Sequence, residues 1–106
     1  MRIDLICSGG LTSTWIAKKL ESYIKAKKLP IEMNARGLND YYPVSRHADA
    51  VLLGPQIGYY KEEVERKLEM PVGVISSQDY ALANSKSIID QAMALAEEKQ
   101  NRKTNA

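Results

Sequence analysis

The sequence predicts an α/β fold: a four-stranded parallel sheet with helices on both faces. Four short apolar runs alternate with longer segments, most of which have the spacing of amphipathic helices. Strands and helices that alternate in this way require parallel strands joined by right-handed crossovers. If the first strand lies centrally, the usual strand order of such a sheet is 2-1-3-4.

The first two strands and the first helix are read from hydrophobic patterns. Residues 2–7 form a buried strand, because their apolar side chains end at a pair of glycines. We expect Asp4, near the start of this strand, to reach solvent. A helix is predicted over residues 13–28, since apolar side chains recur every four residues and lysines cover its other faces; Pro30 ends it. Residues 31–36 alternate apolar and polar, as in an edge strand with one exposed face. The apolar positions of the helix are Ile16, Leu20 and Ile24.

The remaining elements follow in the second half of the chain. A compact apolar run at residues 50–53 is typical of a central parallel strand. A helix comes next and closes at Pro71, and residues 72–75 form the fourth strand. A polar loop over residues 76–79 leads to a last helix that begins near Asn84. The apolar positions of the helix before Pro71 are Tyr60, Val64 and Leu68.

Composition supports one domain in a reducing compartment. Apolar residues make up 44% and charged residues 26%, which is ordinary for a globular chain, and a net charge of +2 gives no electrostatic case for nucleic acid. The single cysteine excludes an internal disulfide. No apolar run is long enough for a signal-peptide core or a membrane span, so we expect a cytoplasmic protein without direct membrane insertion. We expect the domain to cover residues 1–99, with a polar tail over residues 100–106. Residues 39–48 give no clear element.

A glycine-rich turn joins the first strand to the first helix, and Cys7 stands at its mouth. Backbone N–H groups converge in such a turn and the helix dipole adds positive charge, so the turn binds an anion and stabilises a thiolate. We interpret Cys7 as a nucleophile for a phosphoryl group. The predicted cup around it consists of Ser8, Gly9, Gly10, Thr12, Ser13 and Thr14, the last three also being natural helix caps.

A second loop, Gly54-Pro55-Gln56, ends the third strand. In the predicted sheet, the carboxyl ends of strands 1 and 3 face one crevice. We therefore expect this loop to form the other wall of the site, with Gln56 pointing toward Cys7. Tyr80 is a candidate for the rim of the crevice and Tyr59 for a partner surface.

A thiolate in such a cup can take a phosphoryl group and keep it until an acceptor arrives, which is the role of a phosphoryl carrier. Three alternatives to this interpretation stay open. A tyrosine-phosphatase-like site has an arginine six positions after the cysteine, where this chain has Ser13, so fast hydrolysis is not expected. Asp79 is a candidate for the acid of such an enzyme, although a cap or turn role fits it better. The second alternative is a flavodoxin-like module that binds FMN or a nucleotide, against which the loop cysteine argues. The third is a regulatory homologue whose Cys7 reports phosphorylation.

The loop at residues 7–14 resembles the Cys-Ser-Ala/Gly-Gly-Met-Ser-Thr-Ser motif of the IIB subunits of the bacterial sugar phosphotransferase system, lactose/cellobiose type. Residues 52–59, Leu-Leu-Gly-Pro-Gln-Ile-Gly-Tyr, resemble that family's second motif. The resemblance covers about residues 1–98. It departs from the first motif at Leu11, which replaces methionine, whereas all three hydroxyl positions are kept.

The resemblance implies a flavodoxin-like or phosphotyrosine-phosphatase-like three-layer sandwich and a phosphotransferase role. Cys7 would receive a phosphoryl group from a phosphohistidine on a IIA partner and pass it to a sugar of the β-glucoside or disaccharide class at a IIC membrane permease. It also implies that residues 8–14, Leu11 included, bind the phosphoryl oxygens. It implies no cofactor.

His47 is the only histidine, and we place it at the amino end of the third strand, away from the crevice. A catalytic role is therefore not expected for it. One cysteine and one histidine far apart in the sequence do not make a zinc site, so no metal is expected.

Overall fold

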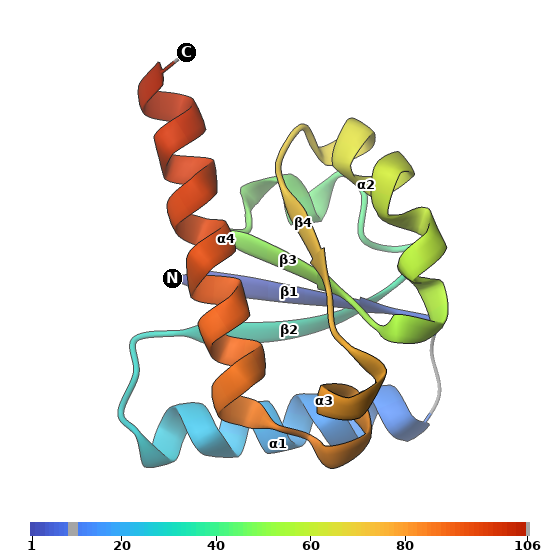
Figure 1. Ribbon diagram of the computed structural model, residues 1–106, viewed down its shortest axis with the longest axis vertical. Helices are drawn as coiled ribbons and strands as arrows, with labels where there is room; N and C mark the ends of the chain where they lie inside the picture. Colours follow the sequence, from blue (N-terminus) through green and yellow to red (C-terminus); the bar gives the residue numbers. More distant parts are fainter. Residues whose placement is uncertain (9–10, 106) are drawn as a thin grey trace.

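The fold is a four-stranded parallel sheet with strand order β2-β1-β3-β4, as predicted (Figure 1). The computed structural model describes residues 1–8 and 11–105, with side chains described for residues 1–8 and 14–102. The strands are β1 (Arg2–Cys7), β2 (Glu32–Gly37), β3 (Ala50–Leu53) and β4 (Val72–Val74). The helices are α1 (Leu11–Ala26), α2 (Lys61–Leu68), α3 (Ser77–Leu82) and α4 (Ser85–Asn105), with 3₁₀ helices η1 (Val44–His47) and η2 (Pro55–Tyr60).

Strand β1 is paired on both sides, with β2 along its whole length and with β3 from Ile3 to Ile6. Cys7 lies opposite Gly37 at the end of the β1–β2 pairing. Because all four strands are parallel, their carboxyl ends lie at one edge of the sheet.

Alternate side chains of the strands enter two separate cores. On one face, Ile3 and Leu5 of β1 and Leu52 of β3 pack with apolar side chains of α1, α3 and α4. On the other face, Ile6 of β1 and Val51 of β3 pack with η2 and α2. This period of two is what a sheet with helices on both faces requires.

Helix α1 begins at Leu11 and ends at Ala26, so the predicted bounds of 13–28 were wrong at both ends. Thr14 and its two predecessors therefore lie in the first turn of the helix rather than capping it. The chain leaves the helix through Lys28, whose φ is 54°, while the N–H of Leu29 donates to the Ile24 carbonyl at 3.0 Å. This left-handed ending satisfies a helix carbonyl before Pro30 is reached.

Two other helices end in the same way. Glu69 after α2 has a φ of 56° and Ala83 after α3 a φ of 47°. Glycine is the usual residue at such positions, because an L side chain crowds the following carbonyl there.

The structure differs from the sequence analysis in three segments outside the strands. The unassigned residues 39–48 contain turns, a cis Tyr42–Pro43 bond and η1. Residues 76–79, predicted to be a polar loop, begin helix α3 instead. The predicted tail from Gln100 continues helix α4 as far as Asn105, and the last turns of α4 extend away from the sheet (Figure 1). No described helix is long and apolar enough to cross a membrane.

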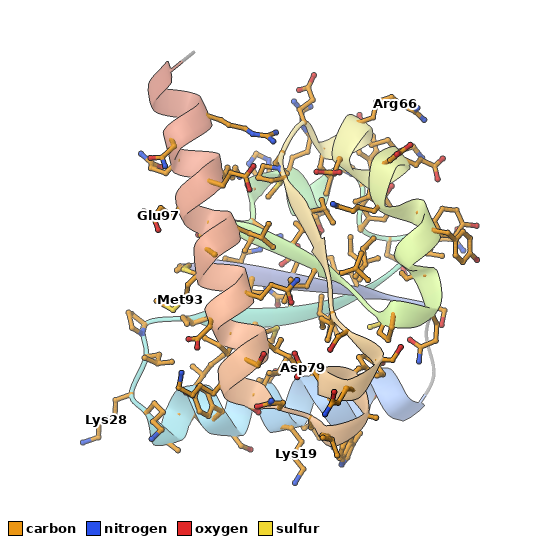
Figure 2. All side chains as sticks on the ribbon, viewed as in Figure 1. Lys19, Lys28, Arg66, Asp79, Met93 and Glu97 are labelled. Atoms are coloured by element: carbon orange, nitrogen blue, oxygen red, sulfur yellow. The ribbon has the colours of Figure 1, made fainter. Side chains whose placement is uncertain are left out.

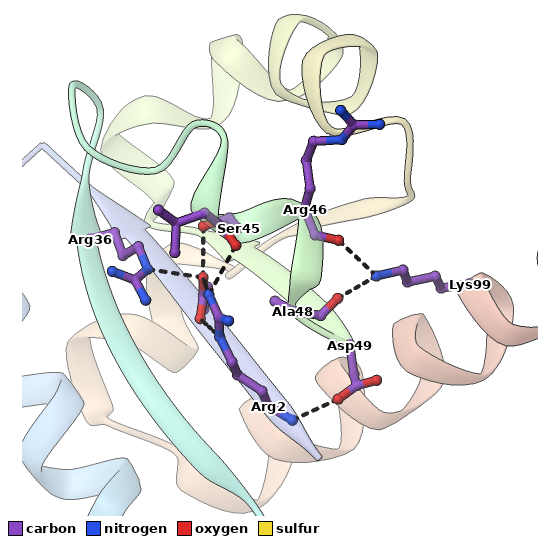
Figure 3. A network of polar contacts seen from close by, with 9 residues as sticks. Arg2, Arg36, Ser45, Arg46, Ala48, Asp49 and Lys99 are labelled. Atoms are coloured by element: carbon purple, nitrogen blue, oxygen red, sulfur yellow. Dashed lines mark hydrogen bonds and ion pairs between the residues drawn. The ribbon is translucent and has the colours of Figure 1, made fainter.

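Asp4 does not reach solvent, which corrects the prediction for this residue: it is fully buried on the α2 face of the sheet. Two arginines and one hydroxyl donate to its carboxylate (Figure 3). The Arg2 guanidinium donates at 3.0 and 2.9 Å, Arg36 Nε at 3.0 Å and Ser45 Oγ at 2.7 Å. The carboxylate thus joins β1 to β2 and to η1.

Burial alone would raise the pKa of Asp4, because it disfavours the charged carboxylate. The hydrogen bonds from Arg2, Ser45 and Arg36 outweigh burial and hold the pKa below its usual value. The carboxylate is therefore ionised and stabilising near neutral pH.

A lysine of α4 fixes η1 from the other side. Lys99 Nζ donates to the carbonyl oxygens of Arg46 and Ala48 (Figure 3). Ser45 donates to Asp4, and Arg2 Nη2 also donates to the Val44 carbonyl at 3.1 Å, so polar contacts attach the irregular segment before β3 to both β1 and α4.

We predict that Asp4→Asn lowers the free energy of unfolding by about 2–3 kcal/mol, because it removes charge-assisted hydrogen bonds at a buried site. The measurement is urea denaturation at neutral pH. The matched control is Asp90→Asn, which removes an exposed i,i+4 pair with Lys86 and should cost at most about 0.5 kcal/mol. Equal losses in the two variants would contradict the prediction.

The stabilisation from Asp4 should disappear in acid. A carboxyl whose pKa is lower in the folded state contributes fully above its unfolded pKa of about 3.9, and loses that contribution as pH falls through the folded value. Urea unfolding of parent and Asp4→Asn between pH 6 and pH 2 should therefore show a difference that shrinks below pH 4. A difference that stays constant over this range would exclude the lowered pKa.

Candidate functional site

Cys7 ends β1 at the carboxyl edge of the sheet and is 4% exposed. Its side chain belongs to the core on the α1 and α4 face, together with Ile16 and Tyr80. Helix α1 begins four residues later, so the sequence from Cys7 to Leu11 runs from a strand end to a helix N-terminus. This is the arrangement in which helix N–H groups and the helix dipole attract an anion.

The structure describes only some of the predicted phosphate-binding residues. Ser8 follows β1 and Thr14 lies in the first turn of α1, and both are exposed. Gly9 and Gly10 lie outside the described residues, as do the side chains of Leu11, Thr12 and Ser13. The phosphate-binding role of this loop stays a prediction.

Gly54 forms the neighbouring strand end, directly after β3. Its N–H donates to the Ile6 carbonyl at 3.0 Å, which continues the β1–β3 pairing up to the site. A Cβ atom at Gly54 would lie 3.9 Å from Cys7 Sγ and 3.6 Å from Tyr80 Cε2. It would lie 3.2 Å from Gln56 Oε1. The structure thus brings Cys7, Gln56 and Tyr80 near Gly54. That this loop forms the second wall of a phosphoryl site, with Gln56 pointing toward Cys7, stays a prediction.

The rest of the second loop turns away into a short helix. Pro55 occupies the first turn of η2, where its missing N–H costs no hydrogen bond. Tyr59 is 78% exposed, and its ring centroid lies 4.5 Å from that of Tyr60. An exposed aromatic ring is available to a partner, but the role of Tyr59 in a partner surface stays a prediction.

Tyr80 reaches the site because residues 77–82 form helix α3, which the sequence analysis missed. Ser76 caps this helix by accepting a hydrogen bond from the Asp79 N–H at 3.0 Å. A serine followed three residues later by an acidic residue is a known start signal for a helix, and this signal could have identified α3. The buried ring of Tyr80 then covers the core beside Cys7.

Asp79 is engaged in structure rather than placed as an acid. Figure 2 labels Asp79 near α3 and the start of α4. Its carboxylate accepts from Asn84 Nδ2 at 3.2 Å and from Ser87 Oγ at 2.8 Å, so it joins α3 to α4. This supports the cap role favoured by the sequence over a leaving-group acid.

His47 lies at the end of η1 and is exposed. It precedes the amino end of β3, whereas Cys7 is at the carboxyl end of the adjacent parallel strand β1. The two residues therefore lie toward opposite ends of the strands. In the described part of the chain, no three His, Cys, Asp or Glu residues lie together as potential metal ligands.

Comparisons with known proteins agree on one family. The family described as "PTS system, Lactose/Cellobiose specific IIB subunit" matches residues 2–91. The oligo-beta-mannoside-specific EIIB component of Bacillus subtilis (strain 168) is 31% identical over 97 residues, which are 89% of this chain and 94% of the relative. The cellobiose-specific EIIB component of Lactococcus lactis subsp. lactis (strain IL1403) is 29% identical over 107 residues, covering 93% and 95%.

A solved structure shows the same fold. The cellobiose-specific phosphotransferase IIB component from Borrelia burgdorferi superposes with a TM-score of 0.77 at 26% identity, covering 93% of this chain and 94% of that one. The flavodoxin-like, three-layer architecture expected from the sequence is thereby confirmed.

We predict that Asp79→Ala lowers the free energy of unfolding by about 1–2 kcal/mol, because Asn84 and Ser87 lose their shared acceptor. Thermal or urea unfolding measures the loss. Glu97→Ala on α4 is the control, since Glu97 is exposed, and it should change stability by no more than about 0.5 kcal/mol. A stability of Asp79→Ala equal to that of the control would contradict the structural role.

Proposed function

Since the chain belongs to the lactose/cellobiose-specific IIB subunits of the sugar phosphotransferase system, we propose that it carries phosphoryl groups on Cys7. Cys7 receives the group from a phosphohistidine on a IIA partner. It then donates the group to a sugar at a IIC membrane permease. The proposal includes a location in the cytoplasm, with which a single cysteine and no disulfide are compatible.

The transfer is an in-line displacement at phosphorus. As the Sγ–P bond forms, the N–P bond of the phosphohistidine breaks and its electron pair stays on the imidazole nitrogen. The thiol proton ends on that imidazole, so atoms and charge balance. Catalysis of this kind consists mainly of positioning and of neutralising the three equatorial oxygens.

One observation carries the proposal: the sole cysteine lies at a strand end, four residues before a helix N-terminus and beside the Gly54 loop. Each charge-assisted hydrogen bond from the loop to the phosphoryl oxygens contributes about 1.5–3 kcal/mol. We assign these bonds to residues 8–14.

The sugar class is the less specific part of the proposal. The named relatives act on oligo-β-mannosides and cellobiose. We infer a sugar of the β-glycoside or disaccharide class for this chain, selected at the permease rather than by the carrier.

The structure gives no support to a phosphatase. The position that would hold the catalytic arginine is Ser13, and the carboxylate of Asp79 already accepts two hydrogen bonds from α4 and the segment before it. A thiolate without these two groups is suited to holding a phosphoryl group until an acceptor arrives.

We predict that the protein gains one phosphoryl group when it is incubated with phosphoenolpyruvate, the general phosphotransfer proteins and a cognate IIA protein. Intact mass spectrometry measures the gain. Cys7→Ala should show none, because the attacking sulfur is absent.

His47→Ala is the matched control, since it removes the only histidine in the sequence and therefore the alternative that the label is a phosphohistidine. It should be labelled to the extent of the parent. Labelling that persists in Cys7→Ala, or is lost only in His47→Ala, would disprove the assignment to Cys7. An unlabelled parent beside a phosphorylated IIA protein would disprove the carrier role itself.

A further inference from the structure

Gly54 has no conformational reason to be a glycine. Its φ of −63° and ψ of 151° lie in the extended region, which any L residue adopts and which a residue before proline favours. Its position is fixed by the backbone hydrogen bond to Ile6 and by Pro55, not by the absence of a side chain. Backbone geometry therefore does not explain why the residue at position 54 is a glycine.

Core packing does not explain it either. A Cβ atom at Gly54 would be in ordinary contact with Tyr80 and with Cys7, at 3.6 and 3.9 Å. Its closest neighbour, 3.2 Å away, would be Oε1 of Gln56, the far end of a flexible and exposed side chain.

Two other glycines show what a packing requirement looks like. A Cβ atom at Gly58 would lie 3.0 Å from Val74 Cγ1, and one at Gly73 would lie 2.7 Å from Leu95 Cδ1. At these positions an added methyl group must displace core side chains. At Gly54 the methyl group would instead occupy space beside the Cys7 thiol.

We propose that Gly54 is a glycine because the phosphoryl group on Cys7 needs the volume that a side chain would fill. This inference rests on the proposed function. Since Cys7 is only 4% exposed, its immediate neighbours determine how much room remains around Sγ. Forming the Sγ–P bond, as the N–P bond of the phosphohistidine breaks, brings phosphorus and three oxygens into that room.

The effect should be large for one methyl group. The reacting atoms must approach in line, and a misplacement of about 1 Å costs about 100-fold in rate. A methyl group 3.9 Å from the sulfur competes for space with the incoming oxygens, not with the resting thiol. Phosphorylation is therefore impaired while the unphosphorylated fold is kept.

The test compares two variants, Gly54→Ala at the N-cap of η2 and Gly58→Ala within η2, in their rate of phosphorylation and their thermal stability. We expect Gly54→Ala to be phosphorylated by the IIA protein at least tenfold more slowly than the parent, with a thermal midpoint close to that of the parent. Gly58→Ala should show the reverse: a lowered midpoint, from the contact with Val74, and a normal rate per folded molecule. Rates come from intact mass at timed quenches and midpoints from circular dichroism.

A double variant separates the volume beside Cys7 from a displaced Gln56. Gly54→Ala/Gln56→Ala removes the 3.2 Å contact and leaves the methyl group beside Sγ, so it also serves if Gly54→Ala alone folds poorly. Compared with Gln56→Ala, it should still be at least tenfold slower. A rate equal to that of Gln56→Ala would overturn the inference, because the effect would then pass through Gln56.

The remaining outcomes distinguish this inference from the proposed function. If the parent is phosphorylated on Cys7 and Gly54→Ala reacts at the parent's rate, the carrier function stands and the role of Gly54 is wrong. If the parent is not phosphorylated, both fail together.

Discussion

The structure depends on β1 being hydrogen-bonded to a parallel strand on each edge. Pairing with β2 and β3 fixes the direction of every side chain of this strand. Odd positions from Ile3 to Cys7 face α1 and α4, whereas Asp4 and Ile6 face α2. The same pairing continues to Gly54, which is thereby held beside the thiol. The candidate site is consequently built on paired strand backbone, and the loops after β1 and β3 surround it.

The buried carboxylate of Asp4, in the same strand, helps to hold the segment between β2 and β3. The segment between β2 and β3 consists of turns and the short helix η1, and polar side chains add to the backbone hydrogen bonds that hold it. Ser45 attaches it to Asp4, and Lys99 of α4 attaches it to the opposite side. Because the two arginines on Asp4 remain partly exposed, the carboxylate is neutralised without three charges being fully buried. These polar contacts add to the apolar packing of Tyr41 and Ala48 in the core on the α2 face.

Most of the fold and the position of the candidate site could be predicted from the sequence. Hydrophobic periodicity predicted four parallel strands. With the first strand taken as central, the strand order and the approach of Gly54 to Cys7 followed from the rule for parallel sheets. The burial of Asp4 could not be predicted, because its partners Arg36 and Ser45 are more than 30 residues away in the sequence and no local pattern indicates them. Helix α3 was missed because six residues are too few for periodicity, although its cap at Ser76 was visible.

The left-handed helix endings have a consequence for protein engineering. Lys28, Glu69 and Ala83 each adopt a conformation that costs an L residue about 1 kcal/mol or more relative to glycine. Lys28 and Glu69 are exposed, so glycine at either position would relieve backbone crowding without a loss of core packing. Ala83 instead packs against the core cluster that contains Cys7, so glycine there would also remove a packed methyl group. The scaffold can therefore gain thermostability at Lys28 and Glu69, two helix ends outside the sheet, without any change at the strand ends around Cys7.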